Sequence, residues 1–105
     1  MRDAASAALA QAERAPGPFR LGCVAVHRGR IAAAACNDFR KHAEAAALAR
    51  APEGVDAVVV VRVDKLGRPA LARPCPACMA LLRRRGVSRV WYSTSDGTMA
   101  REFLP

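Results

Sequence analysis

The stretch "DAVVVVRV", residues 56–63, gives the clearest structural signal in this 105-residue chain. Valine is β-branched and favours strands, and turn-forming residues bound the run on both sides. A strand is therefore predicted here, and the other elements are worked out around it.

Two segments upstream predict a β-hairpin. The sequence "RLGCVAVH" (20–27) has the composition of a buried strand, and the "RGR" that follows has that of a turn. The next run, "IAAAAC" (31–36), is compatible with helix or strand by composition, but the short turn before it favours a hairpin with the preceding strand. A weakly patterned helix is predicted over residues 3–14 and ends at the prolines and glycine of "APGPF".

Two further helices are predicted, each after a strand. The sequence "NDFRK" (37–41) indicates a loop, and a helix follows from about His42 to Ala51, where a proline stops it. After the valine-rich strand, residues 64–74 predict a loop with extended pieces. A helix over about Cys75–Arg85 then ends at a glycine.

The last residues decide the topology. A fourth strand is predicted at "VSRVWYST" (87–94), a tight turn at "SDG" (95–97) and a fifth strand at "TMAREFL" (98–104). Eleven residues after the fourth strand are too few for a crossover helix and another strand, so the fourth and fifth strands must pair antiparallel. The predicted fold class is α/β, a helix-covered mixed β-sheet with the order α-β-β-α-β-α-β-β.

Length and composition set the broad class. A chain of 105 residues predicts a single domain over residues 1–105. No apolar run approaches the roughly 20 residues that span a bilayer, and the N-terminal segment lacks the apolar stretch of a signal peptide. We therefore expect a soluble, intracellular, cytoplasmic protein with reduced thiols. Cys23 and Cys36 stand alone in apolar runs and are most simply small buried hydrophobic residues.

The chain is strongly basic, with a formal net charge of +8. A basic surface suits an anionic partner such as nucleic acid, a nucleotide or an anionic membrane. Arginine and alanine are both abundant, however, as in chains from GC-rich genomes, so charge alone leaves a general compositional bias open as an alternative.

The sequence "PCPAC" (74–78) places Cys75 and Cys78 three residues apart at the start of a helix, on one face. A helix N-terminus favours the thiolate and so lowers the thiol pKa, which suits a soft metal such as zinc. Taken alone, the pair is also compatible with a redox dithiol, half of a zinc site or chance.

His42 also opens a helix, so its side chain can meet the two cysteines at one edge of the sheet. Three protein ligands leave a fourth position for water, as in catalytic zinc sites. Zinc, two thiolates and a neutral imidazole sum to zero charge, and such a site lowers the pKa of bound water towards ~7. Glu44 would take the proton. The alternative for His42 is an ordinary residue at a helix start.

The sequences "HAE" (42–44) and "PCPAC" (74–78) together resemble the signature of the cytidine deaminase-like superfamily. The resemblance covers about residues 20–104. It implies that His42, Cys75 and Cys78 bind Zn²⁺ and that Glu44 carries protons to the ring nitrogen and the departing amine. The implied reaction is hydrolytic loss of ammonia from C4 of cytosine or C6 of adenine.

Two features bear on the branch of the superfamily: the residues around His42 and the predicted antiparallel pairing of the last two strands. Free-nucleoside cytidine deaminases usually carry cysteine in place of His42 and a longer motif after the second strand, and "NDFRKHAE" has neither. The tRNA adenosine deaminases, AID/APOBEC enzymes and deoxycytidylate deaminases share "HAE" but continue with a helix and a parallel fifth strand. The predicted antiparallel ending is similar to the compact branch of bacterial toxin and phage-type deaminases, many of which act on nucleic acid.

We therefore expect a deaminase that converts cytosine to uracil in single-stranded nucleic acid, with DNA favoured over RNA. The alternatives are a free (deoxy)cytidine or (deoxy)cytidylate deaminase, an adenine deaminase, and a non-catalytic zinc-containing module that binds nucleic acid. The resemblance implies contacts from Asn37 and from the backbone N–H of Ala43, although Asn37 is also compatible with a plain turn residue. Basic and aromatic residues near the predicted mouth are candidates for phosphate contact and base stacking: Phe19, Arg20, Phe39, Arg40, Lys41, Arg73 and Tyr92.

Overall fold

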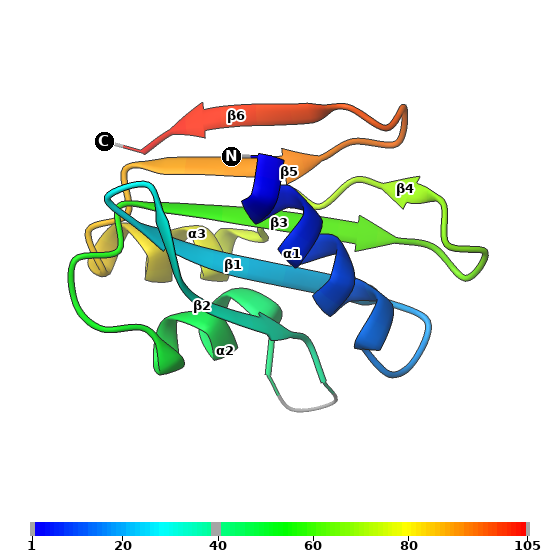
Figure 1. Cartoon of the computed structure of the whole chain (residues 1–105), viewed down its shortest axis with the longest axis horizontal. Coiled ribbons are helices and arrows are strands. Elements are labelled where there is room, and N and C mark those ends of the chain that lie inside the picture. The colour runs from blue at the N-terminus through cyan, green and yellow to red at the C-terminus, as the bar shows by residue number, and fades with distance from the viewer. Residues whose placement is uncertain (1, 39–40, 105) are drawn as a thin grey trace.

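The computed structural model describes residues 2–38 and 41–104. It is a mixed α/β fold, as predicted (Figure 1). In chain order the elements are α1 (Arg2–Arg14), β1 (Arg20–His27), β2 (Arg30–Cys36), α2 (Ala43–Arg50), β3 (Ala57–Val63), β4 (Pro69–Ala70), α3 (Pro76–Arg84), β5 (Arg89–Ser93) and β6 (Met99–Phe103).

The strands form one sheet in the order β2-β1-β3-β5-β6, with β4 paired to β3 off this path. β1 pairs antiparallel with β2 and with β3, whereas β3 and β5 are parallel and are connected through α3. β6 returns antiparallel along β5 after a short turn. The predicted helix-covered mixed sheet with an antiparallel ending is therefore confirmed.

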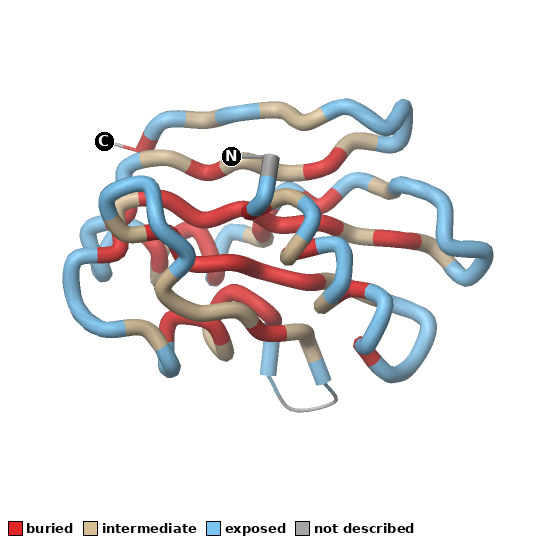
Figure 2. Tube along the Cα trace, viewed as in Figure 1, coloured by how far each residue is buried: buried red, intermediate tan, exposed pale blue. Residues whose placement is uncertain are grey.

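The valine-rich strand β3 lies at the centre of the sheet and is covered on both faces (Figure 2). Val58 and Val60 pack in the core beneath α2 and α3, whereas Val59 and Val61 pack beneath α1 on the other face. Because successive strand residues point to opposite faces, this alternation assigns each β3 side chain to one of two cores. Figure 1 shows α1 crossing the face opposite to α2 and α3.

α1 packs unusually close to the sheet at Gly22 of β1. Its buried alanines, Ala4, Ala8 and Ala12, face the strands. A Cβ atom added at Gly22 would lie 2.0 Å from the Ala8 carbonyl oxygen and 2.5 Å from the Ala12 nitrogen. No other residue type fits there without displacing the helix.

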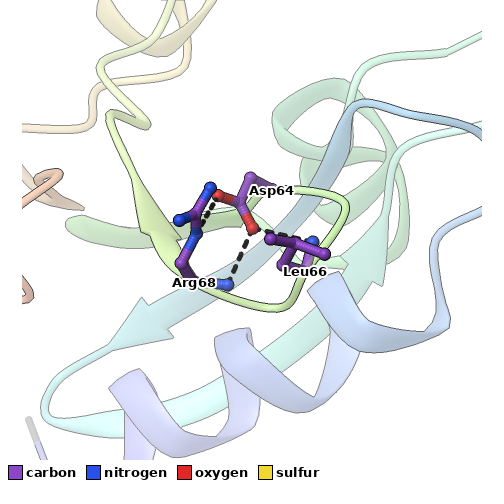
Figure 3. A network of polar contacts seen from close by, with 3 residues as sticks. All are labelled: Asp64, Leu66 and Arg68. Carbon is purple, nitrogen blue, oxygen red and sulfur yellow. Dashed lines mark hydrogen bonds and ion pairs between the residues drawn. The ribbon is translucent and has the colours of Figure 1, made fainter.

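The loop expected over residues 64–74 contains an additional short strand, β4, which the sequence reasoning did not define. The turn before it is closed by Asp64, whose Oδ1 accepts hydrogen bonds from the backbone N–H groups of Leu66 and Arg68, both at 2.9 Å (Figure 3). Asp64 Oδ2 also accepts the Arg68 Nε–H at 2.8 Å. Gly67 adopts a φ of 79° and completes the reversal, so β4 folds back onto β3.

The topology brings two helix N-termini to the same edge of the sheet. β2, β3 and β5 run in the same direction, because β1 is antiparallel to both β2 and β3. α2 follows β2, and α3 follows β3 after the β4 segment, so both helices begin where these strands end. Ligand sites in α/β sheets lie at this edge.

Over the two described ranges, no helix combines the length and apolar character needed to cross a bilayer.

Candidate metal centre and active site

Three predicted zinc ligands come together at the two helix starts. His42 is the N-cap residue of α2, Cys75 is the N-cap residue of α3, and Cys78 lies in the first turn of α3. The His42 Nδ1 atom lies 3.3 Å from the Cys78 Sγ and 3.8 Å from the Cys75 Sγ. All three ligand atoms lie within 4.8 Å of one another.

These distances fit a tetrahedral zinc ion. Zinc binds nitrogen at about 2.0–2.1 Å and sulfur at about 2.3 Å, which places tetrahedral nitrogen and sulfur ligands about 3.6 Å apart. The two observed separations, 3.3 and 3.8 Å, lie on either side of that value. Both cysteines are free thiols, and neither N-cap side chain is used to cap its helix. His42, Cys75 and Cys78 are therefore arranged as a candidate zinc site.

The thiol of Cys78 differs from the sequence-based expectation. A helix N-terminus was expected to lower the pKa of both thiols, but burial, followed by the nearby Glu44 carboxylate, raises the pKa of Cys78 to about 12. Desolvation and a neighbouring negative charge both oppose the thiolate and here outweigh the helix dipole. A cation bound beside Cys78, such as zinc, would favour its thiolate.

Glu44 is a buried carboxyl group beside this site. It lies in the first turn of α2 and is only 3% exposed. Burial raises the pKa of Glu44, and its own backbone N–H, His42 and Cys78 oppose that shift. A carboxyl group with a raised pKa exchanges protons more readily near neutral pH, as a general acid–base catalyst must.

A cavity of about 490 Å³ opens onto Glu44, His42 and Cys75. This volume lies within the range of about 300–1,000 Å³ that is typical of small-molecule sites. It brings together several of the residues predicted to contact substrate, which come from both helix starts and from the loops at this edge. The predicted contact residues that line it are Phe19, Asn37, Lys41, Ala43 and Arg73.

Asn37 uses its side chain to hold the start of β1. Its Oδ1 accepts the Leu21 backbone N–H at 2.9 Å, and its Nδ2 donates to the Phe19 carbonyl oxygen at 2.7 Å. Asn37 therefore fixes the backbone next to Phe19, whose ring is 61% exposed beside the cavity. Its predicted contact with substrate stays a prediction.

Arg73 lines the cavity but is paired with a carboxylate. Its Nε and Nη2 atoms donate to the two carboxylate oxygens of Glu102 at 2.6 and 3.1 Å, and the Tyr92 hydroxyl donates to Glu102 at 2.9 Å. Arg73 and then Tyr92 lower the pKa of Glu102. This contact ties the segment before Cys75 to β6, the last strand of the sheet.

The remaining predicted contact residues lie elsewhere. Tyr92 is not among the residues that line the cavity, and neither is Arg20, which donates to the Glu13 carbonyl oxygen at 3.0 Å. Phe39 and Arg40 fall outside the described residues. The substrate contacts proposed for these four residues stay predictions.

The sequence reasoning missed Arg62 and Leu71, which also line the cavity. Arg62 could have been identified from the sequence, because it is the only charged residue within the otherwise apolar run from Ala57 to Val63. Leu71 could not, since an isolated leucine in a loop has no distinguishing pattern.

Comparisons with known proteins agree with this geometry. The family model described as the cytidine and deoxycytidylate deaminase zinc-binding region matches residues 1–94. Among the solved structures, a mutant cytidine deaminase from Mycobacterium tuberculosis matches with a TM-score of 0.64 and 21% identity, over 90% of this chain and 88% of that chain. This likeness shows the same fold. No curated protein matches the sequence. Since the family match spans most of the chain and includes all three converging ligands, the chain belongs to the family of zinc-dependent cytidine and deoxycytidylate deaminases.

Proposed function

We propose that this deaminase converts cytosine to uracil in single-stranded nucleic acid, with DNA favoured over RNA. The observation that carries the proposal is the composition of the cavity mouth. An exposed aromatic ring, Phe19, and three cationic side chains, Lys41, Arg62 and Arg73, line the same cavity as Glu44. Exposed rings stack flanking bases and cations contact phosphates, the combination with which proteins bind single strands.

The chemistry follows from the buried carboxyl group. His42, Cys75 and Cys78 would hold the zinc ion, which would supply Lewis-acid activation of water at neutral pH. Glu44 would accept one proton of the attacking water and pass it to the ring nitrogen of the base. It would then accept the remaining proton of the added hydroxyl group and pass it to the departing amine, so that ammonia leaves as the carbonyl group of uracil forms. Its burial keeps competing solvent away from the proton and raises its pKa, which suits both steps.

The base enters at the start of α2. The backbone N–H groups of the first turn of a helix have no partner within the helix, so that of Ala43, in the cavity wall, is available to a carbonyl oxygen of the base. Phe19 provides a flat apolar surface beside the same cavity. These contacts orient the amino group towards the zinc site and Glu44.

A second candidate is a deaminase of free (deoxy)cytidine or (deoxy)cytidylate. It is favoured by the likeness of the fold to a structure described as a cytidine deaminase. It also accords with the cavity volume, which is sufficient for a single nucleotide. A non-catalytic zinc module fits less well, because such a module has no need of a buried carboxyl group beside its zinc site.

A substrate competition distinguishes these functions. The zinc-loaded protein is given deoxycytidine, deoxycytidine monophosphate, a single-stranded oligonucleotide and the matching duplex in one reaction, and uracil is quantified in each. We expect the single strand to be converted first. Conversion confined to the free monomers would refute the single-strand proposal and establish the second candidate.

The matched control is Glu44→Gln, which keeps the size and hydrogen-bonding capacity of the side chain. With this variant, uracil formation should be lost for every substrate in the competition. Activity that survives this substitution would point to a contaminating deaminase or to a different mechanism. Parallel oligonucleotides with a single adenine, assayed for inosine, test the alternative base.

A further inference from the structure

Arg62 is a cation in a position that the fold otherwise fills with apolar side chains. On β3, Val58 and Val60 point towards the core beneath α2 and α3, and the strand alternation directs Arg62 to the same face. At that point the core opens into the active-site cavity, which Arg62 lines. Its side chain therefore reaches the cavity from the centre of the sheet.

The backbone of Arg62 is held rigidly. Its N–H donates to the Ser93 hydroxyl at 2.9 Å, and that hydroxyl donates in turn to the Ala70 carbonyl oxygen at 2.8 Å. Arg62 also pairs with Leu21 of β1 and with Ala70 of β4. The arginine consequently projects from a strand fixed on both sides rather than from a loop.

The guanidinium group has few partners. It lies 5.1 Å from the centre of the Phe19 ring, and its Nη1 donates to the Leu71 carbonyl oxygen at 3.4 Å. Its Nε is buried and has no hydrogen-bond partner. Across residues 2–38 and 41–104, no carboxylate forms an ion pair with it. A guanidinium has five N–H donors; the Nε–H is enclosed by protein, so the two terminal nitrogens are the groups that a ligand in the cavity would contact.

The contrast with the other arginine in the cavity is informative. Arg73 is bound through two hydrogen bonds to Glu102, which offsets its charge. Among the described residues, no carboxylate is paired with Arg62, and its guanidinium group lies over the Phe19 ring. A partly buried cation without a counter-ion is costly unless a ligand supplies the negative charge. The planar fork of arginine matches the oxygens of a phosphate.

We propose that Arg62 binds a phosphate group of the nucleotide whose base is deaminated, so that the enzyme prefers nucleotides to nucleosides. This inference rests on the proposed use of the cavity as a deaminase site. The phosphate belongs either to a free nucleotide or to a nucleic-acid strand, and both present the same oxygens to the guanidinium. Because the Arg62 guanidinium lies over the Phe19 ring, the aromatic surface for a base and the cation for a phosphate are adjacent.

The test compares substrates that differ only in phosphate. Values of kcat/KM are measured for deoxycytidine, deoxycytidine 5′-monophosphate and a short oligonucleotide with one cytosine, using the parent, Arg62→Gln and Arg62→Lys. We expect Arg62→Gln to lower kcat/KM about 10- to 100-fold for phosphate-bearing substrates, mainly through KM, since charge-assisted hydrogen bonds are lost. Deoxycytidine turnover should change less than about threefold. Arg62→Lys, which keeps the charge but not the fork, should fall between the two.

Arg30→Gln is the matched control. Arg30 is exposed, lies at the hairpin turn of β1 and β2 and does not line the cavity, yet its replacement changes the net charge equally. It should leave all three substrates unaffected. Equal losses with deoxycytidine and its monophosphate, or no loss with Arg62→Gln, would overturn the phosphate assignment.

Two further measurements distinguish failure of the phosphate contact from failure of the proposed single-strand function. If Arg62→Gln does not fold, inorganic phosphate should inhibit the parent competitively and inhibit Arg62→Lys more weakly, and equal inhibition of the two would overturn the assignment. Binding to zinc-loaded Glu44→Gln, with and without Arg62→Gln, is measured for the nucleoside and the monophosphate. An Arg62-dependent preference for the monophosphate without oligonucleotide turnover would refute the single-strand function and support the phosphate contact. No preference would refute the contact itself.

Discussion

Glu44 has two properties that are unfavourable together in a residue with a purely structural role. It carries a carboxyl group that is ordinarily ionised, and it is buried at 3% exposure beside the candidate zinc site. Burial raises its pKa, so keeping it as a carboxylate opposes folding. A buried carboxyl group that is unfavourable for folding indicates a role in catalytic proton transfer.

Glu44→Gln should therefore lower kcat by about 10²- to 10⁴-fold, the usual contribution of a general acid–base group. A raised carboxyl pKa favours the folded state below the ordinary pKa and loses that advantage as the pH rises through the folded value. With the charge removed, the chelated variant should unfold at a temperature no lower than that of the chelated parent at pH 7. The measurements are uracil formation, zinc content and thermal unfolding.

Zinc content separates this result from a damaged site. The Glu44→Gln variant should retain one zinc ion per chain, because His42, Cys75 and Cys78 are unchanged. Loss of zinc together with activity would assign Glu44 to the metal site instead of to proton transfer.

Among the elements, α1 and β1 depend on each other through Gly22. Gly22→Ala should destabilise the fold by about 1–3 kcal/mol or more, because the new Cβ meets backbone atoms of α1 that cannot move independently. Gly67→Ala is the comparison: its φ is also unfavourable for alanine, at 79°, but no atom lies within 4 Å of the added carbon. It should cost about 1 kcal/mol through backbone strain alone. Urea unfolding measures both, and equal costs would exclude close packing as the cause.

β6 is linked to the active site by Glu102 and Arg73. Glu102→Gln should remove the carboxylate that offsets the charge of Arg73 and so lower KM severalfold for phosphate-bearing substrates, because Arg73 becomes available to a phosphate. A lowered carboxyl pKa adds stability above its ordinary value and loses it as the pH falls through the folded value. The difference in unfolding temperature between parent and variant should therefore be present at pH 7 and shrink as the pH falls below about 4.5.

Glu53→Gln, at an exposed position before β3, is the control for this charge. It should change neither KM nor the pH dependence of unfolding. A similar shift in both variants would mean that net charge, rather than the contact between Glu102 and Arg73, is responsible.

For the chain as a whole, a zinc ion at the candidate site would connect the two helices that carry its ligands. One ligand comes from α2 and two come from α3, so metal binding holds the helix starts together. Removing zinc with a chelator should abolish deamination and lower the unfolding temperature, since a ligand bound only by the folded state stabilises it. Re-adding zinc should restore both, whereas unchanged unfolding after verified zinc loss would contradict the proposed site. Circular dichroism and metal analysis measure the effect.

Much of this architecture was readable from the sequence because its signals are local. The valine run predicted the central strand, and the shortness of the C-terminal segment predicted the antiparallel ending. The zinc ligands were predicted from helix starts together with the resemblance of their motifs. Extended pieces were expected within residues 64–74, but the position of β4 was not predicted, because it depends on the side chain of Asp64 closing a turn. The pKa of Cys78 was expected in the wrong direction, since its burial depends on tertiary packing.

Arg62 is another residue whose role depends on the folded sheet rather than on local sequence. The sequence shows a charged residue in an apolar strand, but which face it occupies depends on its pairing with Leu21 and Ala70. Only the folded sheet reveals that this face opens into the cavity. The net charge of +8 therefore becomes informative once individual cations are placed.

The placement of these cations predicts how binding depends on salt. Lys41 and Arg62 line the cavity, whereas Arg73 is largely offset by Glu102, so two to three phosphate contacts are expected. For single strands, each contact contributes a slope of about −0.7 to log K against log salt, giving about −1.4 to −2.1 overall. Affinity for an oligonucleotide should then fall about 7- to 20-fold between 50 and 200 mM salt, roughly as counterion release requires.

Fluorescence anisotropy with the zinc-loaded Glu44→Gln variant measures this slope without turnover. Adding Arg62→Gln should reduce the slope by about 0.7, the loss of one phosphate contact. Adding Arg30→Gln, which removes the same charge away from the cavity, should leave it unchanged. If both substitutions reduce the slope equally, the strand is held by the general basic surface and not by the cavity. If salt has no effect, phosphate contacts are absent and the enzyme acts on uncharged nucleosides.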